Sequence, residues 1–160
     1  MYKRQRENRN KIGLELGADV TIDARNEDVL ARVKEIVGPK GADYVVDCAG
    51  SEATVNQAVH MTNRGGKVCL AAFPKKPVEF DLGYLAVNNI YLYGIRGEGR
   101  SATHRAMAFM ADKRFDARKI HTHTFPMQDL PEALRYARER VDDAIKVVVS
   151  NKEKTASKAT

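Results

Sequence analysis

Two histidines come closest to a metal site among the residues of this sequence. His121 and His123 lie in the stretch HTHTFP, where the alternation of a strand would place both imidazoles on one face. A zinc site needs further Cys, His or carboxylate ligands at suitable spacing, and the sequence around this pair supplies none. His60 and His104 stand beside no nucleophile pattern. We therefore predict neither a metal site nor a catalytic residue in this chain.

A glycine-rich stretch, GIRGEG at positions 94–99, has the composition that lets a backbone approach a phosphate group. The dinucleotide-binding fingerprint stands at the first turn from strand to helix, whereas this stretch follows a late predicted strand. It is therefore not that fingerprint. The two cysteines, Cys48 and Cys69, stand among apolar neighbours at strand-like positions, so we predict buried, reduced thiols.

The positive charge of the chain is concentrated at its two ends. The net charge is +6 over 160 residues, yet residues 1–11 hold five cations and one anion, and residues 151–160 hold three and one. A nucleic-acid surface needs Lys and Arg gathered on a folded face, so we predict no nucleic-acid partner. No apolar run is long enough to cross a bilayer, and the first residues are polar and basic, unlike a secretory signal. We therefore expect no membrane partner and a cytoplasmic location.

Helices and strands are predicted to alternate along the chain. An apolar stripe predicts a helix that stops at Gly17, and Asn26 can cap the next helix, which stops at Gly38. Ser51 can cap a third helix. Apolar and β-branched runs predict strands at 20–22, 44–46, 67–71, 89–93, 121–125 and 145–149. This alternation predicts the α/β class, with a parallel sheet that carries helices on both faces.

The first predicted helix has no strand before it. A helix that packs on a parallel sheet normally returns from an earlier strand, and the few residues before this one leave no room for a strand. We therefore expect an incomplete sheet, whose opening strand is not part of this sequence.

Five sequence blocks, in their order and at their spacings, resemble one family. The blocks are ELGADVTID, GADYVVDCAG, NRGGKVCLAAF, NNIYLYGIRG and HTHTFPMQDLPEALRYARERVDDAIKVVV. Together they closely resemble the C-terminal half of the zinc-containing medium-chain alcohol dehydrogenases, in particular the threonine, sorbitol and butanediol dehydrogenase branch. The resemblance covers residues 7–149. It implies an incomplete doubly wound, Rossmann-like sheet. Such a domain binds NAD or NADP at the carboxyl edge of its sheet, in enzymes that transfer hydride between an alcohol and nicotinamide.

The resemblance implies cofactor-binding positions at two strand ends. Ala71, Ala72 and Phe73 match the strand end that presents its backbone to the nicotinamide, although Ala72 replaces the usual glycine. Ile95 and Arg96 match the step whose main chain holds the nicotinamide ribose and carboxamide. Because these contacts come from the backbone, the path of the chain matters more there than the identity of each residue.

The resemblance also implies a cofactor contact near the start of the chain. Arg9 stands where relatives carry an arginine that contacts the adenosine ribose; a solvated cation at a helix end is the alternative. Arg4 stands where an acidic residue would bind the ribose hydroxyls of NAD, and a cation there would suit the 2′-phosphate of NADP. Codons for residues 1–5 can, however, match the end of a transposase recognition sequence used for sequencing libraries. We therefore expect residues 1–5 to be a non-native leader, and NAD versus NADP stays open.

The rest of the family pattern has no match in this sequence. In relatives a separate N-terminal domain supplies the zinc ligands and the proton relay, and the first strand carries the glycine turn that binds the pyrophosphate. We therefore expect zinc only in that other domain, weakened cofactor affinity and an inactive fragment. We expect a partial dinucleotide-binding domain over residues 6–150, ending in a return segment, and a disordered tail over residues 151–160.

Two other interpretations stay open. One is a non-catalytic module for nucleotide binding or protein interaction, and the other is the cofactor domain of a zinc-free quinone reductase. In the full-length enzyme we expect a small-molecule alcohol or polyol as substrate. In relatives the strand that matches residues 89–93 pairs with its two-fold mate, so we also expect a homo-oligomer through this edge.

Overall fold

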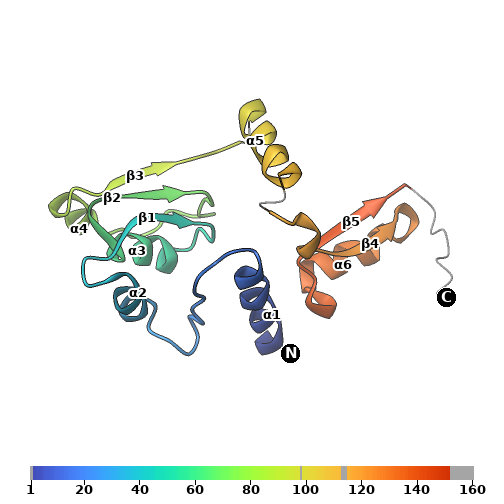
Figure 1. The fold of residues 1–160 in the computed structure, drawn as a ribbon, viewed down its shortest axis with the longest axis horizontal. Coiled ribbons are helices and arrows are strands. Elements are labelled where there is room, and N and C mark those ends of the chain that lie inside the picture. The colour runs from blue at the N-terminus through green and yellow to red at the C-terminus, as the bar shows by residue number, and fades with distance from the viewer. Residues whose placement is uncertain (1, 98, 113–114, 152–160) are drawn as a thin grey trace. The chain divides into compact units, whose positions relative to one another are not determined.

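The computed structural model describes residues 2–97, 99–112 and 115–151, which fall into two compact units (Figure 1). Unit 1 comprises Met1–Thr21 and Arg100–Thr160, and unit 2 comprises Ile22–Gly99. Met1 and the predicted tail from residue 152 lie outside the described residues. The predicted boundary after residue 5 stays a prediction.

Unit 2 is built around a parallel sheet. Its strands are β1 (Ala42–Asp47), β2 (Thr62–Leu70) and β3 (Tyr91–Gly94), hydrogen-bonded in the order β1-β2-β3. Helix α3 (Glu52–His60) connects β1 to β2, and α4 (Leu82–Val87) belongs to the connection from β2 to β3 (Figure 1). Parallel neighbours need such crossovers. The predicted α/β class, a parallel sheet flanked by helices, is confirmed.

The core of unit 2 lies on one face of this sheet. The strand register places Val45, Val68 and Leu92 side by side on that face. Val59 of α3 packs there with Val68, and both side chains are fully buried. Burial of a valine side chain contributes roughly 1.5–3 kcal/mol, so these contacts hold the crossover helix on the sheet.

The opposite face of the sheet is exposed within unit 2. The same register aligns Tyr44 with Lys67 and Tyr91, and the two tyrosines are 53% and 64% exposed. The hydroxyl groups of Tyr44 and Tyr93 form a hydrogen bond, which raises the pKa of Tyr93.

Helix α2 (Val29–Val37) begins two residues later than predicted. Its N-cap is Asp28, whose carboxylate accepts from the backbone N–H groups of residues 30 and 31 at 3.0 and 3.2 Å. Asn26, the predicted cap, instead donates its side-chain N–H to Asp23 at 2.6 Å. The helix stops at Gly38, as predicted, where φ is +95°.

Two of the predicted strands differ from those observed by more than two residues at an end. No strand forms at residues 20–22, because the described residues provide no neighbouring strand to accept its hydrogen bonds. Strand β2 begins at Thr62, earlier than the predicted residue 67, since Ala42 pairs with Thr62 at the start of the ladder. Ser51 caps α3 as predicted and forms a capping box with Thr54.

Unit 1 contains the remaining elements. A two-stranded parallel sheet joins β4 (His121–Pro126) to β5 (Lys146–Ser150), with α6 (Leu130–Glu139) as the crossover. The other elements of this unit are α1 (Tyr2–Glu15), α5 (Gly99–Ala111), and the short 3-10 helices η1 (Ala117–Lys119), η2 (Met127–Asp129) and η3 (Val141–Asp143).

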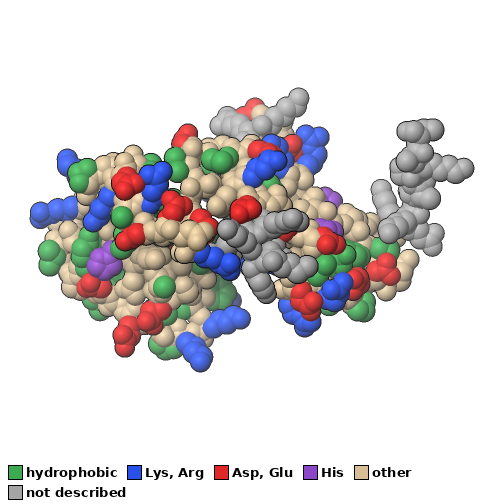
Figure 2. Space-filling view, turned by 90° about the horizontal axis from the view of Figure 1, so that it is seen from below, with side chains coloured by type: hydrophobic (Ala, Val, Ile, Leu, Met, Phe, Trp, Pro, Cys, Tyr) green, Lys and Arg blue, Asp and Glu red, His purple; other side chains and the backbone are tan. Residues whose placement is uncertain are grey.

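The surface shows charges of both signs. On the face in view in Figure 2, Lys and Arg side chains are interspersed with Asp and Glu. None of the helices in the described part of the chain has the length and apolar character needed to cross a membrane.

Candidate functional site

One buried carboxylate organises the carboxyl edge of the unit 2 sheet. Asp47, at the end of β1, is 5% exposed. Its side chain accepts hydrogen bonds from the N–H groups of Ala49 at 3.2 Å and Gly50 at 3.0 Å. Its carbonyl oxygen accepts from the N–H groups of Ala71 at 2.9 Å and Ala72 at 3.1 Å. Asp47 therefore holds the turn after β1 and the end of β2 together. In the sequence, Asp47 is simply the residue that follows the predicted strand 44–46.

Gly50 lets these two segments approach each other. Its φ is +66°, a conformation that residues with a side chain rarely adopt. A Cβ atom on Gly50 would lie 3.0 Å from the carbonyl carbon of Phe73 and 3.2 Å from the Cβ of Ala72. The position of the β2 end therefore depends on the absence of a side chain at residue 50.

A hollow lies between the carboxyl ends of β2 and β3. Its volume is about 470 Å³, within the range of roughly 300–1,000 Å³ that is usual for small-molecule sites. The residues that line it are Leu70, Ala72, Phe73, Pro74, Gly94, Ile95 and Arg96. The ladder between the strands continues to the rim of the hollow, since the N–H of Ile95 donates to the carbonyl of Leu70 at 3.1 Å.

The walls of this hollow suit a flat ligand of mixed polarity. Phe73 and Ile95 expose 74% and 53% of their surfaces, so two large apolar side chains are available for contact. The main-chain N–H groups of Phe73 and Arg96 donate to no acceptor in the part of the chain that the structure describes. A ring that carries a carboxamide could lie against the apolar walls and accept from these N–H groups.

A second hollow, of about 490 Å³, lies beside the first at the ends of β1 and β2. It is lined by Ala49, Gly50, Glu52, Phe73, Pro74, Lys75, Lys76, Pro77 and Val78. Phe73 and Pro74 belong to both hollows. Because the two hollows share a wall, the carboxyl edge of the sheet can accommodate a ligand longer than either hollow alone.

Five of the six predicted cofactor-binding positions lie together in unit 2. Ala72, Phe73, Ile95 and Arg96 line the hollow between β2 and β3. Ala71 lies next to it and is bonded through its N–H to Asp47. The sixth position, Arg9, belongs to unit 1.

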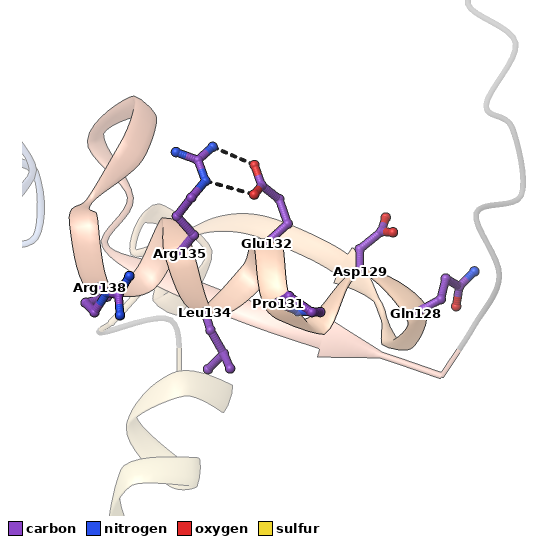
Figure 3. Close-up of a pocket in the computed structure, with 7 residues that line it drawn as sticks. All are labelled: Gln128, Asp129, Pro131, Glu132, Leu134, Arg135 and Arg138. Carbon is purple, nitrogen blue, oxygen red and sulfur yellow. Dashed lines mark hydrogen bonds and ion pairs between the residues drawn. The ribbon is translucent and has the colours of Figure 1, made fainter.

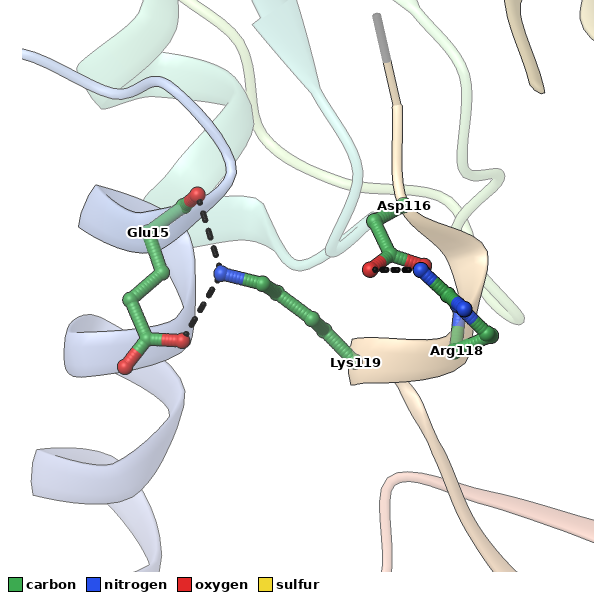
Figure 4. Close-up of polar contacts among 4 residues, drawn as sticks. All are labelled: Glu15, Asp116, Arg118 and Lys119. Carbon is green, nitrogen blue, oxygen red and sulfur yellow. Dashed lines mark hydrogen bonds and ion pairs between the residues drawn. The ribbon is translucent and has the colours of Figure 1, made fainter. Parts of the chain in front are cut away.

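Arg9 makes its own contacts within unit 1. Its guanidinium donates to the carbonyl oxygen of Ala144 at 3.4 Å. Partial burial lowers the pKa of Arg9, the nearby cation of Arg140 lowers it further, and Asp143 opposes the shift. A second polar contact of α1 is shown in Figure 4, where Lys119 donates to the side chain of Glu15 at 3.0 Å. The ribose contact of Arg9 stays a prediction.

A larger hollow, of about 860 Å³, lies along α6 in unit 1. All of its lining residues come from the single segment 128–138. Figure 3 shows Arg135 and Glu132 paired by two hydrogen bonds, of 2.8 and 2.6 Å, while Leu134 projects away from the pair. This pairing lowers the pKa of Glu132 and raises that of Arg135. Because Glu132 and Arg135 are already paired with each other and one segment forms the hollow, we assign no function to it.

The histidines of β4 do not share one environment. A register irregularity falls between His121 and His123. The ring of His121 is hydrogen-bonded to the Thr124 hydroxyl at 2.8 Å, whereas that of His123 packs against Tyr136 with ring centroids 5.1 Å apart. No cluster of three or more His, Cys, Asp or Glu side chains that could hold a metal is found among the described residues.

The two cysteines differ in part from prediction. Both thiols are free, but only Cys69 is buried; Cys48 is exposed because it follows the last residue of β1 at the sheet edge. His60 makes two side-chain contacts. Its Nε2 lies 3.3 Å from the carboxylate of Asp81, and the centroid of its ring lies 4.2 Å from that of Tyr84.

Comparison with known proteins gives similar sequences and similar folds. The chain is 30% identical over 145 residues to YdjJ of Escherichia coli K12, described as an uncharacterized zinc-type alcohol dehydrogenase-like protein; the match covers 89% of this chain and 41% of that protein. It is 25% identical over 135 residues to sorbitol dehydrogenase of Bacillus subtilis, and this match covers 84% of this chain and 38% of that protein. The solved structure of an oxidoreductase of unknown specificity from E. coli superposes with a TM-score of 0.83 at 25% identity. The superposition covers 91% of this chain and 42% of that chain.

The chain thus spans about two fifths of the length of the relatives it matches. The profile of one family, described as zinc-binding dehydrogenase, matches residues 4–112. That match covers more than half of the chain and includes the whole edge from Asp47 to Arg96. The chain therefore belongs to the zinc-binding dehydrogenase family, and it is a cofactor-domain portion of such an enzyme.

Proposed function

We propose that this chain binds the nicotinamide end of NAD or NADP in the hollow between β2 and β3, as part of an alcohol or polyol dehydrogenase. The observation that carries the proposal is the convergence of Ala72, Phe73, Ile95 and Arg96 on one hollow at the carboxyl edge of a parallel sheet. Ala71 supports the same strand end. Arg9 is proposed to contact the adenosine ribose.

The residues of the hollow have distinct proposed roles. Phe73 and Ile95 exclude water from the face of the ring that they contact. The N–H groups of Phe73 and Arg96 donate to the carboxamide and thereby orient the ring. The cofactor, when bound, supplies the hydride donor or acceptor.

The substrate class is proposed from the relatives. Their names include L-threonine 3-dehydrogenase and sorbitol dehydrogenase, so an alcohol or polyol is the proposed substrate of the complete enzyme. We propose that the zinc ligands and the proton relay come from residues outside this sequence, since the described residues offer no zinc site. The isolated chain is accordingly proposed to bind cofactor without turning over substrate.

Self-association is proposed through β3. This strand ends the order β1-β2-β3, so its outer edge is unpaired in the described sheet. An unpaired edge of this kind can continue into the sheet of a second copy.

A bulky side chain at Gly94 tests the proposed cofactor site. Gly94 lines the hollow, and a Cβ atom there would meet nothing within 4 Å. We expect Gly94→Trp to fill the hollow and weaken binding of reduced nicotinamide mononucleotide by at least about tenfold, a loss of about 1.4 kcal/mol. Gly94→Ala, the matched control, leaves the hollow open and should bind within about twofold of wild type. Saturation-transfer NMR measures both affinities.

The same titration distinguishes the proposal from its alternatives. Saturable binding in the wild-type chain that Gly94→Trp removes supports a cofactor site in this hollow. Equal binding by wild type and Gly94→Trp would place the ligand elsewhere. Absence of binding by the wild-type chain would contradict the proposal.

A further inference from the structure

One side of α3 carries three polar residues at four-residue spacing. Glu52, Asn56 and His60 follow one another at intervals of about one helical turn, so they form a continuous polar seam along the helix. The apolar face of the same helix, which includes Val59, packs into the core. The core therefore fixes α3 on the sheet and leaves the seam free to bind another segment.

The seam binds the far end of the loop that follows β2. The Glu52 carboxylate accepts from the N–H of Glu79 at 3.2 Å. The Asn56 side chain donates to the carbonyl of Glu79 at 2.8 Å and accepts from the N–H of Asp81 at 3.2 Å. His60 lies 3.3 Å from the Asp81 carboxylate. Three side chains thus hold two residues of the loop, Glu79 and Asp81, by backbone and side-chain contacts.

The near end of the same loop forms the wall shared by the two hollows. Phe73 and Pro74 line both of them. Only four residues separate Pro74 from Glu79, and one of these is Pro77. Two prolines fix two φ angles of this short connection and reduce its freedom, so an anchor at Glu79 limits the movement of Phe73.

We propose that the polar seam, and Asn56 in particular, positions the loop 73–81 as the wall of the cofactor site. This inference rests on the proposed function. Asn56 touches no ligand in this account; it acts through the loop, because its carboxamide satisfies a donor and an acceptor of the loop backbone at once.

Limited trypsin digestion tests the anchor without any cofactor. The bond between Lys75 and Lys76 lies in the loop and both lysines are exposed, whereas the bond after Lys76 precedes Pro77 and resists trypsin. Asn56→Ala removes both side-chain hydrogen bonds to the loop, so we expect the cleavage rate after Lys75 to rise about tenfold. Gln57→Ala, on the same helix and without a side-chain hydrogen bond to the described residues of the loop, should leave this rate unchanged.

Titration with reduced nicotinamide mononucleotide tests the positioning role. Asn56→Ala should weaken binding by about fivefold or more, while Gln57→Ala should bind like wild type. As a second pair, Glu52→Ala should raise cleavage and weaken binding, and Glu52→Gln should restore both, because its amide oxygen still accepts from Glu79. These variants keep the test informative if Asn56→Ala fails to fold.

The outcomes separate this inference from the proposed function. If the wild-type chain binds and both Asn56→Ala and Glu52→Ala bind with the same affinity, the positioning role is overturned and the proposed function stands. Unchanged cleavage after Lys75 in both variants overturns the anchor itself. Absence of wild-type binding overturns the proposed function and, with it, the role of the seam in cofactor binding.

Discussion

Asp47→Ala should lower the free energy of unfolding of unit 2 by about 3 kcal/mol. The substitution leaves the N–H groups of Ala49 and Gly50 without their acceptor at a position where Asp47 is 5% exposed. Hydrogen bonds to a charged group contribute about 1.5–3 kcal/mol each, so two losses exceed most single-residue effects. Urea unfolding followed by circular dichroism measures the change.

Asp43→Ala provides a matched control on the same strand. Asp43 is exposed and accepts one side-chain hydrogen bond, from Asn63 at 3.0 Å. Its loss should lower the free energy of unfolding by less than about 1 kcal/mol. A change at Asp47 no larger than the change at Asp43 would show that the buried carboxylate does not organise the sheet edge.

Gly50→Ala is expected to impair both folding and cofactor binding. The positive φ of Gly50 disfavours any side chain, and the new Cβ would lie 3.0 Å from the Phe73 backbone. We expect the free energy of unfolding to fall by about 2 kcal/mol. Binding of reduced nicotinamide mononucleotide should weaken by about tenfold, because relief of the contact displaces Ala72 and Phe73. Urea unfolding and NMR titration measure the two effects.

Gly65→Ala separates the backbone effect from the steric effect. Gly65 also has a positive φ, +75°, but a Cβ there would meet nothing within 4 Å. It lies near the start of β2, away from the hollow at its carboxyl end. Gly65→Ala should lose about 1 kcal/mol of stability and retain wild-type binding. Equal binding losses in the two variants would contradict a specific role for the approach of residue 50 to Phe73.

Local sequence signals predicted those parts of the fold that local chemistry determines. Gly38 ends α2 because glycine alone adopts its positive φ without strain, and Ser51 caps α3 because its hydroxyl accepts from a helical N–H. The order of helices and strands predicted a parallel sheet with crossovers, and the structure confirms it.

The errors arose where a neighbour in space decides the outcome. The β-branched residues 20–22 form no strand, since the described chain provides no partner strand. Both Asn26 and Asp28 are good caps, and the hydrogen bond of Asn26 to Asp23 decides between them. Tyr44 lies in a predicted strand as expected, yet whether its face is covered depends on elements distant in sequence.

The sequence predicted residues that line the candidate hollow, but it did not predict the residues that hold the surrounding loops in place. The family resemblance selected Ala72, Phe73, Ile95 and Arg96, which the structure brings together. Asp47 and Asn56 were missed, because an aspartate at a strand end and an asparagine within a helix carry no distinctive pattern. Their roles appear only when the loops that they bind are in place.

The nicotinamide end of the cofactor is proposed to bind between the ends of β2 and β3. The most direct measurement is an ¹H–¹⁵N NMR titration of the chain with reduced nicotinamide mononucleotide. We predict saturable chemical-shift changes at the backbone amides of residues 71–73 and 94–97, with unit 1 amides along α6 unchanged. Changes centred on α6, or no saturable change at the β2 and β3 ends, would contradict the claim.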